Sequence, residues 1–364
     1  MRLARRSSPL GPARVELGTA LAGLSASAIV AIALVVSVPA RALAQGPALF
    51  RAFVPYSSVV TTRPTPTPAA TPEVCTETES QDYGRNGTID RVVTLTFAGH
   101  ADPVREEIDE DADGSPDSIT TFRYNSSGVR TALMHDGNAD GIFELSARYY
   151  HDAGGKPLWT EISSFGVLQS VLRWQYDDQG QLVRHVRDED ADGLLDFIRE
   201  YGYNSRGLVA LIETDDDADS TIDSIGRYFY DDNDNLIRHE IEELDGSLLD
   251  STRLYDWQDN LLVRYRWDLG ADGVIDSITQ YNYDAEGREV LVEVDRQADG
   301  EFDDWTQTQY NAIGKVVSVI LYRNRAWHDS LTHTYYESGR LTLSIYESES
   351  YGTWSKRYEY SCAR

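Results

Sequence analysis

Short runs of apolar and aromatic residues recur from about residue 75 to the end of the chain, and polar segments containing glycine separate them. Runs such as 277–283 and 288–294 are rich in β-branched and aromatic residues, and they partly alternate polar with apolar positions. This pattern is typical of half-buried β-strands. It predicts an all-β body without helices.

Two kinds of connection alternate between these runs. The first is an acidic stretch of nine residues, and most copies follow one another at 27 residues; the recognisable copies begin at Asp82, Asp109, Asp136, Asp188, Asp215, Asp268 and Asp295. The second follows a Tyr-x-Tyr pattern with Asn or Asp and then Gly, as in 124–128, 203–207 and 283–287, which is the chemistry of a tight turn. Degenerate acidic copies near 161–169, 242–250, 322–330 and 346–354 bring the total to eleven units.

A strand, a tyrosine turn, a second strand and an acidic loop make each unit a β-hairpin. Repeated without long connections, these hairpins predict an antiparallel meander of about eleven units, with acidic loops along one rim and tyrosine turns along the other. Neighbouring acidic loops should then lie two strand spacings apart, about 9.6 Å. We expect the sheet to curl into a hollow or closed, barrel-like or ring-like form.

The tyrosine turns resemble the YD repeat of the RHS family, whose pattern of Gly, a short strand, Y-x-Y-D-x-x-G and an apolar residue is matched from Gly273 to Val290. The resemblance covers roughly residues 82–360, although the unit here is longer and the extra length lies in the acidic loop. YD repeats form large curled β-sheets that enclose a hollow, so the resemblance implies a sheet of that kind. The chain has too few repeats for a full cocoon.

The acidic stretch has the composition of a calcium loop. In Asp109–Asp117 the carboxylates stand at positions 1, 3, 5 and 9 and Gly at position 6 permits a sharp turn, so several oxygens can converge on one hard cation. The stretch resembles the D-x-D-x-D-G-x-x-D loop of integrin-type propeller repeats. It is not an EF-hand, because position 12 (Thr120, Arg199 or Gly226) offers no bidentate Glu.

The candidate ligands differ in quality among the seven loops. Four good sites and three weak ones are expected, the weak ones because Gly84, Gly270 or Gln297 occupies position 3. The good sets are Asp109, Asp111, Asp113 and Asp117; Asp136, Asn138, Asp140 and Glu144; Asp188, Asp190, Asp192 and Asp196; and Asp215, Asp217, Asp219 and Asp223. The weak sets that retain three carboxylates are Asp268, Asp272 and Asp276, and Asp295, Asp299 and Asp303. The alternative is that Asp, Asn and Gly serve here only as turn formers and the acidity only maintains solubility.

The two cysteines stand at opposite ends of the repeats. The repeat phases of Cys75 and Cys362 both fall within one tyrosine turn, so the chain starts with the second strand of a hairpin and ends with the first. A disulfide requires Cα atoms about 4.4–6.8 Å apart, so bonding within one molecule requires the sheet to close. Two free or intermolecular thiols are the alternative.

The N-terminus reads as an export signal. Residues 1–44 combine a basic start, an apolar run and the small-x-small site Ala42-Leu-Ala44, although an uncleaved membrane anchor is the competing interpretation. Residues 45–74 are rich in Pro and Thr and predict an extended, disordered stalk, and residues 75–364 form the repeat domain. The formal net charge of −27 disfavours nucleic acid and anionic lipid as direct partners. We therefore expect a secreted, cell-surface or periplasmic protein that meets a membrane only through its N-terminal segment.

The sequence shows no catalytic motif. Its seven histidines form no metal-spaced cluster, and no nucleophile, phosphate-loop or dinucleotide pattern is present, so we expect no enzyme. Neither predicted strand face is uniformly apolar, which disfavours an outer-membrane barrel. The sequence favours an exported, calcium-binding structural or binding module; the alternatives are a carbohydrate-active enzyme or glycan-binding adhesin, and an inert envelope spacer without specific ion binding. No extracellular glycan or protein partner can be named.

Overall fold

The computed structural model describes residues 74–99, 101–244, 246 and 250–361, and these residues form strands and connections without a helix. The alternating pattern of the sequence thus becomes 22 β-strands. Their bounds are Val74–Tyr83 (β1), Arg91–Ala98 (β2), Arg105–Asp109 (β3), Ser118–Tyr124 (β4), Arg130–Asp136 (β5), Leu145–His151 (β6), Pro157–Ser164 (β7), Val167–Tyr176 (β8), Leu182–Asp188 (β9), Phe197–Tyr203 (β10), Val209–Asp215 (β11), Ser224–Tyr230 (β12), Leu236–Glu243 (β13), Ser251–Gln258 (β14), Leu261–Leu269 (β15), Ser277–Tyr283 (β16), Glu289–Asp295 (β17), Asp304–Tyr310 (β18), Val316–Arg323 (β19), Ala326–Tyr335 (β20), Leu341–Ser348 (β21) and Gly352–Tyr360 (β22).

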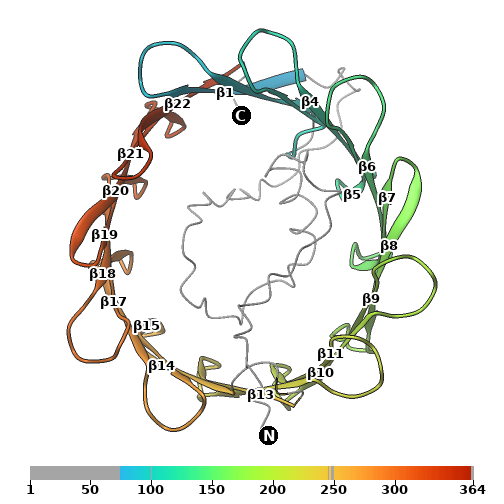
Figure 1. Ribbon diagram of the computed structural model, residues 1–364, viewed down its shortest axis with the longest axis vertical. Coiled ribbons are helices and arrows are strands. Elements are labelled where there is room, and N and C mark those ends of the chain that lie inside the picture. The colour runs from blue at the N-terminus through green and yellow to red at the C-terminus, as the bar shows by residue number, and fades with distance from the viewer. Residues whose placement is uncertain (1–73, 100, 245, 247–249, 362–364) are drawn as a thin grey trace, which may run out of the picture. The chain divides into compact units, whose positions relative to one another are not determined.

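The strands form one antiparallel meander that closes on itself. Each strand pairs with its neighbours in sequence, and β1 also pairs with β22 from Glu77↔Tyr360 to Tyr83↔Trp354. Figure 1 shows the resulting ring of strands, with β1 and β22 side by side. The predicted all-β hairpin meander and its closure are confirmed. Closure also removes both sheet edges, which would otherwise present unpaired backbone groups.

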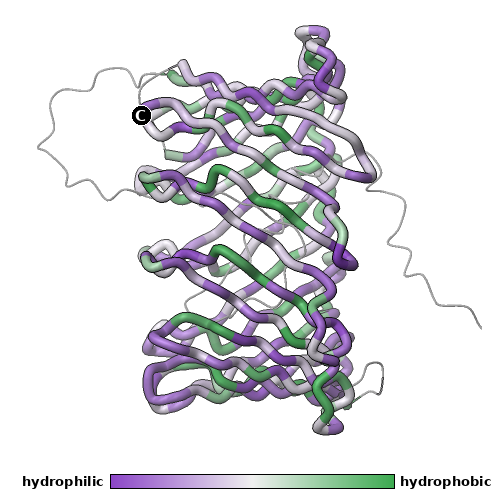
Figure 2. The backbone as a smooth tube through the Cα atoms, turned by 90° about the vertical axis from the view of Figure 1, so that its left-hand side faces the viewer, coloured by the Kyte–Doolittle hydropathy of each residue, from purple (hydrophilic) through white to green (hydrophobic). Residues whose placement is uncertain are grey.

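Side chains alternate between the two faces of the sheet, and apolar and polar residues follow one another along the strands in Figure 2. One face carries an aromatic cluster, in which Leu236, Tyr255 and Tyr265 are buried and pack against Tyr228 and Tyr281. We call this the aromatic face. The opposite face carries cross-strand ion pairs such as Arg227–Glu242, 2.8 Å apart. Among the described residues, no helix is long and apolar enough to cross a membrane.

The second aromatic residue of the Tyr-x-Tyr pattern has a role that the sequence analysis did not predict. The register shifts at this residue, as between Asn282 and Tyr283, so that a bulge precedes the turn. Its side chain then donates a hydrogen bond to a backbone carbonyl of the preceding hairpin, as from Tyr283 to Leu262 at 2.7 Å. The same bond recurs from Tyr124, Tyr203, Tyr230, Trp257, Tyr310, Tyr335 and Tyr360. These bonds join successive hairpins at the rim of tyrosine turns.

The segments predicted as export signal (1–44) and stalk (45–74) lie outside the described residues, except that β1 begins at Val74. Cys362 also lies outside them. The described barrel runs from Val74 in β1 to Tyr360 in β22.

Candidate metal centres on the acidic rim

The seven acidic loops share one backbone conformation. The fourth residue of each loop is in the left-handed region, with φ from 49° to 58° at Arg85, Ala112, Ala139, Ala191, Ala218, Ala271 and Ala298. The sixth residue also has positive φ, as in Gly114 at 95°. Gly adopts such angles without the Cβ clash that other residues meet. Ser220 is the exception, because it holds a φ of 77° at the sixth position.

Backbone amides orient the carboxylates at the two ends of each loop. In the loop that follows β3, Asp109 accepts hydrogen bonds from the amides of Asp113 and Gly114, at 3.1 and 2.8 Å. Asp117 accepts a bond from the amide of Glu110 at 2.7 Å. Equivalent bonds fix the first and ninth residues of the loops that begin at Asp136 and Asp215. The loop therefore brings its two ends together through its own backbone.

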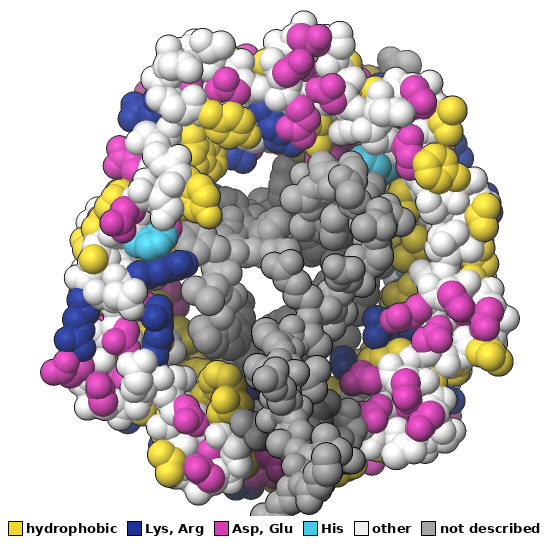
Figure 3. Space-filling model, in the orientation of Figure 1, with side chains coloured by type: hydrophobic (Ala, Val, Ile, Leu, Met, Phe, Trp, Pro, Cys, Tyr) yellow, Lys and Arg dark blue, Asp and Glu magenta, His cyan; other side chains and the backbone are white. Residues whose placement is uncertain are grey.

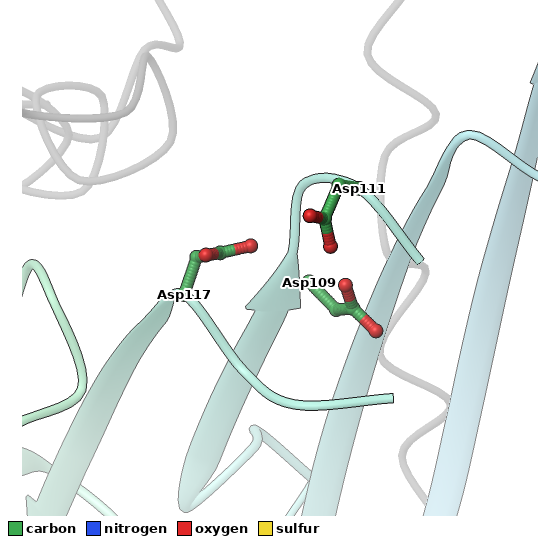
Figure 4. Close-up of side chains that lie close together, drawn as sticks. All are labelled: Asp109, Asp111 and Asp117. Carbon is green, nitrogen blue, oxygen red and sulfur yellow. The ribbon is translucent and has the colours of Figure 1, made fainter. Parts of the chain in front are cut away.

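Four loops bring three carboxylates together. In each of them one oxygen from each of three residues lies within 4.8 Å of the other two. Figure 4 shows Asp109, Asp111 and Asp117 placed in this way around a common space. We call the four groups the carboxylate clusters: Asp109, Asp111 and Asp117; Asp136, Asp140 and Glu144; Asp188, Asp190 and Asp196; and Asp215, Asp217 and Asp223. They occur in the four loops that the sequence ranked as good.

The fifth residue of the loop lies outside three of these clusters. Asp113, Asp192 and Asp219 each accept a hydrogen bond from the amide two residues later, at 2.7–2.8 Å. In the loop that begins at Asp136, position 3 is Asn138, whose side-chain amide donates to Asp140 at 3.3 Å. The structure thus brings each predicted ligand set together in part, through positions 1, 9 and either 3 or 5.

The three weak loops keep the hydrogen bonds but not the convergence. Asp268 and Asp295 still accept bonds from the amides of Gly273 and Gly300, both at position 6. Asp272, Asp276, Asp299 and Asp303 lie in these two loops, but the described residues there form no group of three carboxylates close enough to share a cation. All four clusters therefore lie between β3 and β12, an arc that we call the carboxylate arc.

Arginine supplies positive charge at the loop that begins at Asp295. Arg296 pairs with Asp304, and Arg325 from the β19–β20 turn lies 2.7 Å from Glu301. The hydrogen bond and charge of Glu301 raise the pKa of Arg325, with Asp303 and Asp299 adding to the effect. Side chains of the protein thus offset the negative charge of this loop.

Asp188 differs from the first residue of the other three clusters. Its side chain is 2 % exposed, and its Oδ2 accepts a bond from the amide of Gly193 at 3.1 Å. Its Oδ1 is buried and has no hydrogen-bond partner among the described residues, whereas the Oδ1 of Asp136 or Asp215 accepts a bond from the amide at position 5. A buried, unpartnered carboxylate oxygen is costly, and a cation in the cluster of Asp188, Asp190 and Asp196 would satisfy it.

The atoms that each of the four clusters offers to a metal ion are carboxylate oxygens. Carboxylate and carbonyl oxygens suit hard cations such as Ca²⁺, Mg²⁺ and Mn²⁺ rather than the softer metals that prefer Cys or His. Ca²⁺ takes six to eight oxygens at distances of about 2.3–2.6 Å in flexible geometry. An irregular, half-exposed set of carboxylates fits Ca²⁺ better than the strict octahedron of Mg²⁺.

The sequence matches no protein-family model and no curated protein. Among solved structures, the chain is similar to one in the crystal structure of a TcdB2–TccC3–Cdc42 complex, with 12 % identity and a TM-score of 0.32 over 79 % of this chain and 20 % of that one. It is also similar to a porin-like protein from Bacteroides uniformis, with 11 % identity and a TM-score of 0.26 over 79 % of this chain and 96 % of that one. The chain spans about a fifth of the length of the first of these proteins.

Proposed function

We propose that the protein is an exported, calcium-binding β-barrel module, in which Ca²⁺ at the carboxylate clusters holds the acidic rim together. Four clusters with the same loop geometry support this proposal, and the buried, unpartnered Oδ1 of Asp188 is the observation that carries it. Its work is structural or in binding, at or beyond the cell surface.

Charge repulsion explains why such a rim needs a cation. The oxygens of one cluster lie within 4.8 Å of one another, well inside the Debye length of about 8 Å at physiological salt, so salt does little to screen their repulsion; neighbouring loops, about 9.6 Å apart, repel one another more weakly. Ca²⁺ bound to the folded state alone stabilises it by roughly 2.7 kcal/mol per site at one hundred times its Kd. Several occupied sites together would therefore raise the melting temperature markedly.

Titration of the chelator-stripped protein with Ca²⁺ in a calorimeter tests the proposal. We expect up to four strong sites, and a melting temperature that falls with a chelator and recovers with added Ca²⁺. The absence of binding heat at millimolar Ca²⁺, together with a melt that does not respond to the chelator, would refute the proposal.

Two adjacent residues of one loop provide a matched pair of variants. Asp217 belongs to a cluster, whereas Asp216 is exposed beside it and outside the cluster. Asp217→Asn keeps an oxygen that can accept the bond from the amide of Asp219 but removes one charge from the cluster; since Asn138 holds the same position in the loop that begins at Asp136, we expect the site to bind Ca²⁺ more weakly, not to be lost. Asp216→Asn removes the same charge from the same loop and should leave the affinity of the site unchanged.

A further inference from the structure

Two arginines on the aromatic face lack a carboxylate partner. Arg199 in β10 and Arg253 in β14 form no ion pair with any residue that the structure describes. On the opposite face of strands β9–β15, four arginines each have a carboxylate oxygen within 3.5 Å: Arg184, Arg227, Arg238 and Arg266. Carboxylates are not scarce, because the chain has a net charge of −27 and acidic side chains form groups at many places around the ring in Figure 3. The two unpaired arginines are therefore a local feature of the aromatic face.

Strand register places both arginines on that face. Residues that are directly opposite each other in neighbouring strands share a face of the sheet. Arg253 is opposite His239, which is opposite Tyr228 of the aromatic face. The register of β11 connects Arg199 in the same way to Ser224 in β12, and Ser224 lies four residues before Tyr228, so it shares its face.

The side chains around Arg253 leave hydrogen-bond donors unsatisfied. Four residues of β12–β15 are directly opposite one another, with Cβ atoms about 5 Å apart: Tyr228, His239, Arg253 and Trp267. The Nε of Arg253 and the Nε1 of Trp267 are buried and have no hydrogen-bond partner among the described residues, and both atoms can only donate. Because a buried, unpartnered donor is costly, an acceptor at this row would stabilise it.

Both guanidinium groups lie near the hydroxyl of Tyr228. Burial raises the pKa of Tyr228, and the charges of Arg253 and Arg199 lower it; the remaining group that shifts this pKa is another tyrosine, not a carboxylate. Gly226 lies below the ring, since an added Cβ would be 3.3 Å from Tyr228 and 3.4 Å from the Nε2 of His239. The missing side chain lets these two rings lie close to the sheet, between the strands that carry the two arginines.

Arg253 lacks the contacts that satisfy the other arginine. Arg199 lies over the ring of Phe197 at 5.0 Å, and its Nε donates to the hydroxyl of Thr214 at 3.2 Å. Among the described residues, Arg253 has no ring contact of this kind, and its buried Nε has no partner. Packing alone does not explain such a residue, because an apolar side chain of similar length would fill the space without burying a charge.

We propose that Arg253 and Arg199, together with Tyr228 and Trp267, bind an oxyanion: a carboxylate, sulfate or phosphate group. A guanidinium holds two oxygens of such a group in its fork, and the bound charge offsets two cations that have no counter-charge in the protein. A neutral ligand would leave both charges unpaired, and a long polyanion is repelled by a body with so many carboxylates. The ligand is therefore a small anion or a molecule that carries one or a few anionic groups. This inference goes beyond the proposed function and requires no Ca²⁺.

Calorimetric titration of the full chain with sulfate, benzoate and acetate, at constant ionic strength in a buffer that contains Ca²⁺, tests the inference. Sulfate replaces phosphate as the inorganic probe, because phosphate precipitates with Ca²⁺. We expect saturable binding of one anion per chain. Tighter binding of benzoate than of sulfate and acetate would identify an organic anion whose ring packs on the aromatic face, and tighter binding of sulfate would identify a free inorganic anion. If none of the three binds saturably, the inference is wrong.

Variants of two arginines in neighbouring strands locate the bound anion. Arg253→Gln keeps a side chain that can donate but removes the charge and the fork, so it should weaken anion binding at least tenfold. Arg264→Gln is the matched control, because Arg264 is exposed on the opposite face of β15, and it should leave the affinity unchanged. Arg199→Gln should also weaken binding, and it decides the question if the first variant does not fold. Equal affinity in Arg253→Gln and the wild type would place the anion elsewhere, for example at a bound Ca²⁺, and would overturn the inference.

Discussion

At the scale of single residues, two buried histidines on the aromatic face affect the stability of the barrel. His185 stacks on Trp174 with ring centroids 5.3 Å apart, and His239 stacks on Tyr228 at 4.2 Å. Each is 7 % exposed. Burial first, and then the charges of Arg187 and Arg199 beside His185 and of Arg253 beside His239, lower the pKa of both histidines to about 4. Both imidazoles are therefore neutral in the folded protein at pH 7.

We predict that acid destabilises the barrel through these two side chains. Because the folded pKa lies below the unfolded value near 6.5, the unfolded chain takes up protons first, so stability falls as the pH drops from 6.5 towards 4. Linkage gives about 2 kcal/mol per histidine at pH 5. Urea unfolding at pH 7 and pH 5 measures the loss, and the double variant His185→Phe, His239→Phe should lose less. Equal losses in the variant and the wild type would exclude the histidines as the cause.

The tyrosine hydroxyls that join successive hairpins should make a measurable contribution. Tyr283→Phe removes the 2.7 Å bond to the carbonyl of Leu262 and should lower the free energy of unfolding by about 1 kcal/mol. Tyr351→Phe is the control, since Tyr351 is 84 % exposed, and it should change nothing measurable. Chemical unfolding of both variants in saturating Ca²⁺ makes the comparison. An equal effect of the two substitutions would mean that the inter-hairpin bond contributes no stability.

At the scale of the loop, one residue departs from the common design. Ser220 holds a φ of 77° where all six other loops have Gly with a φ between 87° and 95°. We predict that Ser220→Gly relieves this strain and stabilises the protein by about 1 kcal/mol, with tighter Ca²⁺ binding at the cluster of Asp215. Thermal unfolding and calorimetry measure the two effects.

The matched control for Ser220→Gly is Ser115→Gly, at the seventh position of the first cluster loop. Ser115 is not among the residues with positive φ, so Gly there only adds freedom to the unfolded chain. It should destabilise by about 0.5–1 kcal/mol. Opposite signs for two Ser→Gly changes would show that backbone strain, not residue type, sets the outcome.

The sequence predicted the strands and loops that are determined by residues repeated at fixed positions in each unit. Asp at positions 1 and 9 and Gly at 6 predict the loop, and the residue at position 3 ranked the four loops that form clusters above those at Asp268 and Asp295. It could not predict the bulge before Tyr283, which depends on pairing with β17. Nor could the sequence predict that Asp188 has a buried Oδ1 without a hydrogen-bond partner, because this depends on the positions of the surrounding atoms. Both features depend on the exact backbone geometry of one hairpin or one loop, which the residue pattern does not specify.

At the scale of the whole molecule, the candidate cation sites and the closure lie in different parts of the ring. The carboxylate arc ends at β12, whereas β17 to β20 use Arg296 and Arg325 near the acidic loop. The junction of β1 and β22 lies outside the carboxylate arc and depends on the pairing of two terminal strands. Ca²⁺ is therefore expected to stabilise only the carboxylate arc, and the β1–β22 junction requires a separate stabilising interaction.

The predicted disulfide between Cys75 and Cys362 would stabilise this junction by linking the two ends of the repeat region. Ser361 donates its amide to the carbonyl of Thr76 at 2.9 Å, and Gly84 donates to Thr353 in the same way, so these are hydrogen-bonded pairs of the β1–β22 ladder. Cys75 and Cys362 are the next residues in sequence after Thr76 and Ser361, which supports the predicted disulfide.

We predict that a non-reducing peptide map of the protein, produced in an oxidising compartment, contains the Cys75–Cys362 link. The crosslink would close a loop that contains almost the entire barrel, so it should stabilise by up to about 5 kcal/mol. Reduction, or Cys75→Ser with Cys362→Ser, should lower the melting temperature and first expose the amides of β1 and β22 to hydrogen exchange, because a ring without its fastening opens where its terminal strands meet. Ser at both positions removes the bond at little cost in volume. If hydrogen exchange were to begin elsewhere, or if the peptide map were to show only intermolecular links, the prediction that a Cys75–Cys362 disulfide stabilises the β1–β22 junction would be wrong.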